Sequence, residues 1–397
     1  MVFLLPRFVA SIWLAVPVLA GGLLLSGCNS KPTATETDKT ATVISGKTNA
    51  ASDSAATTAR PDSIGMAGIS NGAKPTGPKP TWGPNTKPEM QAVIEQLMSF
   101  KNKPLPEVTA VQARKQPTAA DAAMKQMQIS KIPVPPLNCD TVTKTFMPGV
   151  KARIYTPKSG AAPFPVIVYY HGGGWVIATN DTYAASAQAL CEQLGAMVVS
   201  VEYRKGPEHK FPTAHDDAFA AYQYVLKNAA SMQGDPAKVD VVGESAGGNL
   251  ACAVSMMARD KKVALPKYQV LVYPIAGYDQ NTPSYQANTT TAPLNKGAMG
   301  WFFKNYLRTP ADGQDPRINL VAANLKGLPP TTVISAEYDP LMSEGKILAD
   351  KLTAAGVKVN YKLYEGTTHE FFGMAAVVPQ AKEAQGLAVS DLKGALK

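Results

Sequence analysis

A short buried strand runs into a tight turn and then a helix at Val239-Asp240-Val241-Val242-Gly243-Glu244-Ser245-Ala246-Gly247. The strand is rich in β-branched residues, and the residues that follow, Ala246–Arg259, have helical spacing. Glycines on both sides of Ser245 allow a sharp turn that would hold the serine hydroxyl at its tip. The plainer interpretation is a glycine-rich connection whose serine caps the helix. The strand, turn and helix together favour a nucleophilic serine.

The same alternation of strands and helices continues on both sides of this turn. The other strand-like runs are short and continuously apolar, which is typical of strands buried on both faces. Helical stretches such as Ala214–Asn228 lie between them. The sequence therefore predicts an α/β fold with a mostly parallel central sheet flanked by helices. The other expected strands are Val166–Tyr170, Met197–Val201, Val270–Tyr273, Thr331–Ser335 and Val359–Tyr364.

A glycine loop, His171-Gly172-Gly173-Gly174-Trp175, directly follows the strand Val166–Tyr170. Three successive glycines leave backbone N–H groups unobstructed, as stabilisation of a developing oxyanion requires. Nucleotide binding is the competing use of such loops. The chain has no Gly-x-Gly-x-x-Gly fingerprint and no phosphate-binding lysine motif, so the oxyanion interpretation is favoured.

A serine nucleophile needs a base and an acid that orients the base. Only one of the four histidines, His369, follows Ser245, as the order serine, acid, histidine demands. Asp339 lies between them, just after the expected strand Thr331–Ser335, and its carboxylate would fix the imidazole tautomer. Glu337 and Glu344 are close rivals on spacing alone.

The chain resembles the hormone-sensitive-lipase-like branch of the α/β-hydrolases, the bacterial family IV esterases. The resemblance spans about residues 88–397. The matching pieces are His171–Trp175, Tyr203-Arg204, Pro207-Glu208-His209, Phe211-Pro212, Gly243–Asn249, Leu328-Pro329-Pro330, Glu337–Leu341, Glu344-Gly345, His369 and Phe371.

This resemblance implies an α/β-hydrolase fold with a helical cap, which would map to about 88–135 and 277–325. It also implies Ser245 as nucleophile, Asp339 as acid and His369 as base. The implied oxyanion hole consists of the N–H groups of three residues, two of which belong to the same motif loop as His171 and Gly172. These three residues are Gly173, Gly174 and Ala246.

The chain departs from the family pattern at a few positions near the site. Glu244 stands where the family often has Asp, and Lys205-Gly206 replaces a more usual Leu-Ala. Glu370 stands where Gly is frequent beside the histidine. Its carboxylate is placed to raise the pKa of His369.

The amino terminus has the features of an exported lipoprotein. Residues 1–27 carry one charge, Arg7, before an apolar run that ends Leu25-Ser26-Gly27-Cys28, which resembles a lipobox. We expect a cleaved signal peptide over 1–27, lipidation of Cys28 and a flexible low-complexity linker over 28–87. The alternative is an uncleaved transmembrane helix, since the run is long enough to cross a bilayer. Both interpretations imply export, with attachment to the bacterial cell envelope.

Charge and composition exclude several classes of function. The formal net charge is +9, but the 39 Lys and Arg are scattered, which does not favour nucleic-acid binding. No His-Glu-x-x-His motif or other metal constellation is present, and no cofactor is implied. Besides Cys28, the three cysteines Cys139, Cys191 and Cys252 allow one disulfide, whose pairing stays open. Cys252 falls on the helix after Ser245, where we expect a buried apolar residue.

The function that these observations favour is ester hydrolysis by a membrane-tethered serine hydrolase. Ser245 would attack the carbonyl of a small-molecule ester and form an acyl-enzyme. Short to medium acyl chains are implied by the resemblance. Hydrolysis of amides or peptides by the same triad is an alternative. A non-catalytic, tethered envelope protein is another.

Overall fold

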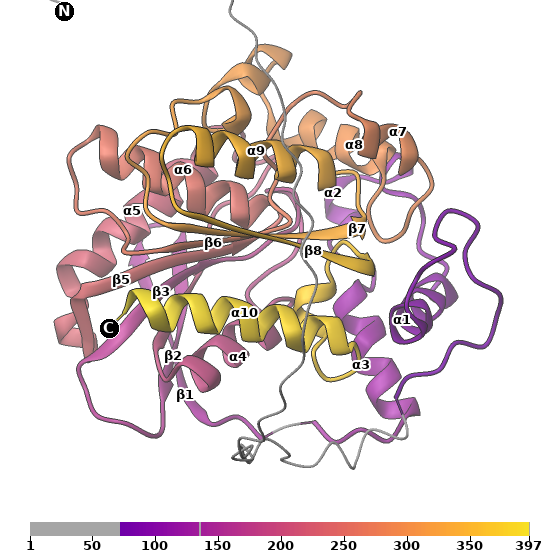
Figure 1. Ribbon diagram of the computed structural model, residues 1–397, viewed down its shortest axis with the longest axis horizontal. Helices are drawn as coiled ribbons and strands as arrows, with labels where there is room; N and C mark the ends of the chain where they lie inside the picture. Colours follow the sequence, from indigo (N-terminus) through magenta and orange to yellow (C-terminus); the bar gives the residue numbers. More distant parts are fainter. Residues whose placement is uncertain (1–71, 135, 397) are drawn as a thin grey trace, which may run out of the picture. The chain divides into compact units, whose positions relative to one another are not determined.

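The computed structural model describes residues 72–134 and 136–396, and these form a layered α/β structure (Figure 1). The described residues contain one eight-stranded sheet in the order β1-β2-β4-β3-β5-β6-β7-β8. Strands β1, β2 and β4 pair antiparallel, and all pairs from β4 onward are parallel. The predicted mostly parallel sheet is therefore confirmed. The strands are β1 (Cys139–Met147), β2 (Val150–Pro157), β3 (Phe164–Tyr170), β4 (Met197–Glu202), β5 (Gly234–Glu244), β6 (Gln269–Val272), β7 (Thr331–Tyr338) and β8 (Val359–Thr368).

Helices cover both faces of the sheet, with α5, α6 and α9 on one side and α4 and α10 on the other (Figure 1). The helices are α1 (Pro88–Ser99), α2 (Ala110–Ala113), α3 (Ala119–Ile129), α4 (Ala184–Leu194), α5 (Thr213–Asn228), α6 (Ala246–Asp260), α7 (Pro283–Ala287), α8 (Lys296–Tyr306), α9 (Met342–Ala354) and α10 (Pro379–Ala395). Single 3-10 turns span Leu105–Glu107, Ala230–Met232, Pro310–Gln314, Leu320–Ala322 and Phe371–Met374.

Strand β3 shows why the central strands are continuously apolar. Val166 and Val168 point into the core that α5, α6 and α9 cover, whereas Ile167 and Tyr169 point into the core beneath α4 and α10. All four side chains are fully buried. Because successive side chains alternate between two covered faces, every position of the strand must be apolar.

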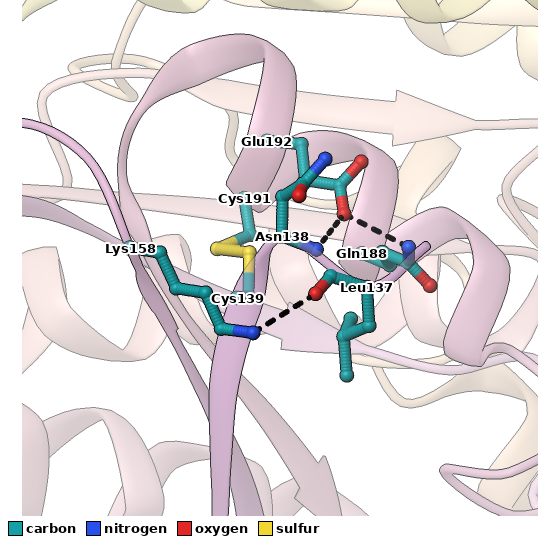
Figure 2. Close-up of a disulfide and its surroundings, with 7 residues drawn as sticks. All are labelled: Leu137, Asn138, Cys139, Lys158, Gln188, Cys191 and Glu192. Atoms are coloured by element: carbon teal, nitrogen blue, oxygen red, sulfur yellow. Dashed lines mark hydrogen bonds between the residues drawn. A yellow bond between two sulfur atoms is a disulfide. The ribbon is translucent and has the colours of Figure 1, made fainter. Parts of the chain in front are cut away.

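The outer strands β1 and β2 did not stand out in the sequence. Six of the nine residues of β1 are exposed, so the strand lacks the apolar run that marks the central strands. A disulfide between Cys139 of β1 and Cys191 of α4 holds this edge to the helix layer (Figure 2). Beside it, the backbone N–H of Asn138 donates to Glu192 at 2.8 Å. Among the described cysteines only Cys252 is free, and it is buried as expected.

The folded part begins earlier than expected. The linker was predicted to extend to residue 87, but residues 73–87 already pack against the domain. Thr86 is fully buried, and the backbone N–H of Asn85 donates to the hydroxyl of Tyr338 at 3.0 Å. The ring of Trp82 packs edge-on against Tyr338, with their centroids 5.9 Å apart. Proline-rich composition suggested a linker here, although this extended segment is anchored by one aromatic ring and by backbone hydrogen bonds.

The two segments predicted to form a cap contain short helices, and they contact each other where α8 meets the 3-10 turn Leu105–Glu107. Helices α1, α2 and α3 belong to the first segment, and α7 and α8 to the second. The indole N–H of Trp301 in α8 donates to the carbonyl oxygen of Val108 at 3.0 Å. Arg114, at the end of α2, forms an ion pair with Glu208 at 2.7 Å. Glu208 thus fastens the first cap segment to the sheet domain.

The predicted signal peptide, Cys28 and most of the predicted linker lie outside the described residues. Within the part of the chain that the structure describes, no helix is both long and apolar enough to cross a membrane.

Candidate active site

Ser245 occupies a strained turn between β5 and α6. Its backbone has φ 56° and ψ −119°, a conformation that residues with a side chain rarely adopt. The surrounding contacts explain the two glycines. A Cβ atom on Gly243 would lie 2.0 Å from the carbonyl oxygen of Gly247, and one on Gly247 would lie 1.9 Å from that of Tyr170. Only glycine fits at either position, so the local sequence dictates this turn.

The glycine loop after β3 lies against the same turn. Gly173 and Gly174 have φ values of 96° and 57°, which favour glycine. A Cβ atom on Gly172 would lie 3.1 Å from the carbonyl oxygen of Glu244, next to the serine. The hydroxyl of Tyr203 donates to the carbonyl oxygen of His171 at 2.8 Å and holds the start of the loop. The glycine loop therefore lies directly beside the serine turn.

The structure brings His369 and Asp339 together with Ser245. Nε2 of His369 lies 2.9 Å from Oγ of Ser245, and Nδ1 lies 2.7 Å from Oδ2 of Asp339. All three side chains are buried. The two other candidates for the acid have other hydrogen-bond partners. Glu337 accepts from the backbone N–H of Gly366. Glu344 accepts from that of Ala276.

Neighbouring carboxylates set the electrostatics of His369. Burial lowers the pKa of its imidazole, because burial disfavours the charged ring. The neighbouring carboxylates, Asp339 first among them, together outweigh this effect and raise the pKa above its ordinary value. Glu370 and Glu244 add to the rise. The ring is therefore a stronger base than an unperturbed histidine, and a stronger base takes a serine proton more readily.

Comparisons with known proteins show the family of the chain. A family model described as alpha/beta hydrolase fold matches residues 167–373. The chain belongs to the α/β-hydrolase family. Among relatives of this hydrolase, a carboxylesterase named NlhH from Mycobacterium tuberculosis is 36% identical over 70% of this chain and 91% of its own. An ethyl acetate hydrolase from Pseudomonas putida is 32% identical over 61% of this chain and 77% of its own.

A solved structure shares both the fold and part of the sequence. An esterase from Pyrobaculum calidifontis superposes with a TM-score of 0.67 at 33% identity, covering 76% of the hydrolase and 98% of that chain. The α/β-hydrolase fold expected from the sequence is thus confirmed.

A buried group of tyrosines surrounds Glu244, next to the serine of the hydrolase. The hydroxyl of Tyr169 donates to Glu244 at 2.5 Å, and the hydroxyl of Tyr273 donates to its other oxygen. Burial raises the pKa of Glu244 to about 7, although these hydrogen bonds oppose the rise. The Tyr273 ring also packs against the ring of His369, with centroids 4.5 Å apart. Glu244 therefore contributes to the site through Tyr273, which it binds and which packs against His369.

Two other histidines of the hydrolase are buried and neutral. Burial lowers the pKa of His171 and of His215 to about 4 in each case. His215 joins three helices: its ring nitrogens lie 2.8 Å from the Tyr306 hydroxyl and 2.9 Å from Oδ1 of Asn249. Both rings are structural, and His369 is the histidine that meets the serine.

Helix α8, in the second of the segments predicted to form a cap, packs on the glycine loop of the hydrolase. A Cβ atom on Gly174 would lie 2.2 Å from the ring of Phe302 in α8, so this ring sits directly on the loop. Ser245 is 4% exposed and His369 3% exposed. The serine and the histidine therefore have little contact with solvent.

Two residues that contribute to the site, Phe302 and Tyr183, were not predicted from the sequence. Phe302 gave no signal, because it is one of several aromatic residues in an apolar helix. Tyr183 gave none either, although its hydroxyl donates to Glu370 at 2.6 Å across 187 residues of sequence. The unusual residue Glu370 was the available clue to this contact. Among the described residues, no group of three or more His, Cys, Asp or Glu side chains is arranged to hold a metal ion.

Proposed function

We propose that this hydrolase cleaves carboxylic esters with short to medium acyl chains through an acyl-enzyme on Ser245. The observation that carries the proposal is the hydrogen-bonded series from Oγ of Ser245 through His369 to Asp339, with distances of 2.9 and 2.7 Å. A serine hydroxyl in this setting has a base within hydrogen-bond distance, and the base is itself oriented.

In the acylation step, Oγ of Ser245 attacks the ester carbonyl while Nε2 of His369 takes its proton. The carbonyl oxygen becomes an oxyanion, which the N–H groups of Gly173, Gly174 and Ala246 would stabilise. The tetrahedral intermediate then collapses, and His369 gives the proton to the departing alkoxide. The alcohol leaves, and the acyl group stays on the serine.

In the deacylation step, water replaces the alcohol. Nε2 of His369 takes a proton from the water as its oxygen attacks the acyl carbonyl. The second tetrahedral intermediate collapses, the bond to Oγ of Ser245 breaks, and His369 returns the proton to Oγ. The carboxylic acid is released and the resting state is restored. Asp339 stays ionised and stabilises the imidazolium in both steps.

Ester hydrolysis as the reaction rests on the family and its relatives. The chain is a carboxylesterase: it is 36% identical to the carboxylesterase NlhH over most of that protein, and solved esterases share its fold. The name of the ethyl acetate hydrolase relative favours small esters. The Phe302 ring on the glycine loop supports a restricted acyl pocket, since it occupies space beside the oxyanion position.

Export and lipid anchoring through Cys28 are a separate part of the proposal. A structural disulfide persists in an oxidising compartment, and Cys139–Cys191 is of this kind because both cysteines are buried in the fold. Metabolic labelling with a palmitate analogue tests the anchor. We expect label on the wild-type chain and none on Cys28→Ala. Equal labelling of both would contradict lipidation at this residue.

The catalytic proposal is tested with the full chain purified in detergent. We would assay p-nitrophenyl esters from acetate to palmitate, and matched anilides, with Ser245→Ala as the control. We expect hydrolysis that is highest on short esters, much slower on anilides and lost in Ser245→Ala. Comparable rates on esters and anilides would favour an amidase. Ser245→Ala with wild-type rates would disprove the assignment of the nucleophile.

A further inference from the structure

Glu370 has a backbone conformation that is unfavourable for its residue type. It follows His369 directly and has φ 70° and ψ 4°, in the left-handed region where glycine is favoured. A side chain kept at such a position points to a role for that side chain, because a glycine would relieve the strain.

The Glu370 carboxylate faces the catalytic side of the histidine. Its Oε1 lies 4.0 Å from Nε2 of His369, the nitrogen that contacts Ser245. Asp339 contacts the opposite nitrogen, Nδ1, at 2.7 Å. The imidazole ring therefore lies between two carboxylates, and only one of them belongs to the triad.

Tyr183 holds Glu370 in this place. Its hydroxyl donates to Oε1 of Glu370 at 2.6 Å, so the same oxygen that faces Nε2 is already bonded. Tyr183 is 4% exposed and its hydroxyl packs on the glycine loop, since a Cβ atom on Gly172 would lie 2.2 Å from it. The tyrosine is thus fixed between the oxyanion loop and the histidine loop.

The contact between Glu370 and His369 changes with each proton transfer. In the resting state Nε2 accepts a hydrogen bond from the hydroxyl of Ser245 and carries no hydrogen of its own. Once Nε2 is protonated, a positive N–H lies near the Glu370 carboxylate, and opposite charges at this separation favour the charged ring. An interaction that strengthens as the imidazolium forms lowers the barrier to proton transfer.

We propose that Glu370 is a positioning residue that stabilises the protonated form of His369, and that Tyr183 keeps its carboxylate from closing onto Nε2. This inference rests on the proposed triad. A free carboxylate would capture the Nε2 proton in a direct hydrogen bond and divert it from the leaving alcohol. Tyr183 prevents that by holding the carboxylate 4.0 Å from Nε2 through its hydrogen bond to Oε1.

Several other ionisable groups face His369 and act on it together with Glu370. Asp339 after β7, Glu244 at the end of β5 and Tyr273 after β6 surround the ring. Within the described part of the chain, His369 is the only basic side chain within 4.0 Å of the Glu370 carboxylate. Glu370 is 25% exposed, which weakens its effect through solvent screening but leaves it the carboxylate nearest to Nε2.

The first test is the pH profile of Glu370→Gln in the full chain. The amide keeps the size of the side chain and removes its charge. We expect the acid limb of kcat/KM to move to lower pH by about half a unit to one unit, because His369 loses a stabiliser of its charged form. We also expect kcat on the plateau to fall about tenfold. Glu365→Gln, which removes an exposed carboxylate on β8, should leave both unchanged.

The second test is a double-mutant cycle with Tyr183→Phe. The single variant frees Glu370 to approach Nε2, so we expect a loss of kcat larger than that of Glu370→Gln. In the Glu370→Gln background, Tyr183→Phe should cost little, because no charged group remains to be restrained. Additive losses in the cycle would overturn the restraining role of Tyr183.

The failure of this inference differs from the failure of the proposed function. A fluorophosphonate that labels Ser245 reports the pH at which His369 becomes a competent base. If the wild-type chain neither labels nor hydrolyses esters, the triad proposal fails. If it does both and Glu370→Gln keeps the wild-type acid limb, the role of Glu370 is disproved. Glu370→Gly, which relieves the backbone strain, gives the same readout if Glu370→Gln folds poorly.

Discussion

Asp339 and His369 directly follow two residues that pair with each other on the neighbouring strands β7 and β8. Tyr338 of β7 pairs with Thr368 of β8, and the next residues place Oδ2 of the acid 2.7 Å from Nδ1 of the base. The register between these two strands therefore selects the acid. A shift by one residue would move the carboxylate of Asp339 out of reach of Nδ1 of His369.

Asp339→Asn should keep the fold and remove most of the activity. The amide cannot stabilise the imidazolium and favours the wrong tautomer of His369, so we expect kcat to fall by about a thousandfold or more with little change in KM. Steady-state kinetics on p-nitrophenyl acetate measure this. Glu337→Gln, which alters the rival acid on the same strand end, should stay within a few-fold of wild type. A larger loss in Glu337→Gln than in Asp339→Asn would contradict the assignment.

Phe302→Ala should extend the range of accepted acyl chains. Its ring sits on Gly174 in the oxyanion loop, so its removal opens space where the acyl chain of a bound ester would lie. We expect the preferred p-nitrophenyl ester to shift toward longer chains, with the acetate rate reduced. Phe303→Ala is the comparison variant, because that ring packs against Tyr278 and Trp175 and not on Gly174. A chain-length profile identical in Phe302→Ala and wild type would exclude this ring as a pocket wall.

Local sequence was sufficient for the parts of the site that depend on the backbone of one turn. Gly243 and Gly247 flank Ser245, and a Cβ atom at either position would clash with a backbone carbonyl oxygen. The turn can therefore be predicted from five residues. The central strands were predictable for a similar reason, since burial on both faces leaves a continuous apolar run. The edge strand β1 was not, because its six exposed residues carry no such run.

Contacts between distant segments could not be predicted from the spacing of residues in the sequence alone. The choice of Asp339 over Glu337 depends on the register of β7 and β8. Spacing favoured Asp339 only narrowly, and the resemblance to known esterases strengthened that choice. Tyr183 and Glu370 are 187 residues apart, and nothing in either neighbourhood indicates the other. The pairing of Cys139 with Cys191 depends in the same way on where the edge strand meets α4.

Removal of the disulfide should lower the stability of the domain without changing its chemistry. Cys139 and Cys191 are separated by 52 residues, and loop-closure entropy for a loop of that length predicts a loss of about 4 kcal/mol in the free energy of unfolding. Urea denaturation of Cys139→Ser/Cys191→Ser measures this. Cys252→Ala should lose less, and only the wild type and this control should be sensitive to dithiothreitol. Equal stability of the double variant and wild type would contradict the prediction.

Asp240 should make the domain less stable as the pH rises. It is fully buried on β5, and within the described residues neither carboxylate oxygen has a hydrogen-bond partner. Burial raises its pKa to about 7, and the positive charge of Lys267 offsets only part of the rise. The folded state therefore holds a proton that the unfolded chain releases near its ordinary pKa of 3.8.

The direction in which stability changes with pH follows from that difference in bound protons. The protonated side chain is tolerated below about pH 4, and stability falls between about pH 4 and 7 as the buried group is forced to ionise. Asp240→Asn removes the ionisation, so we expect it to be more stable than wild type at pH 8 by about 1–3 kcal/mol and nearly equal to it at pH 4. Urea unfolding at both pH values measures the two differences. A gain of the same size at pH 4 and pH 8 would mean that the titration of Asp240 is not the cause, since a packing effect of the amide does not depend on pH.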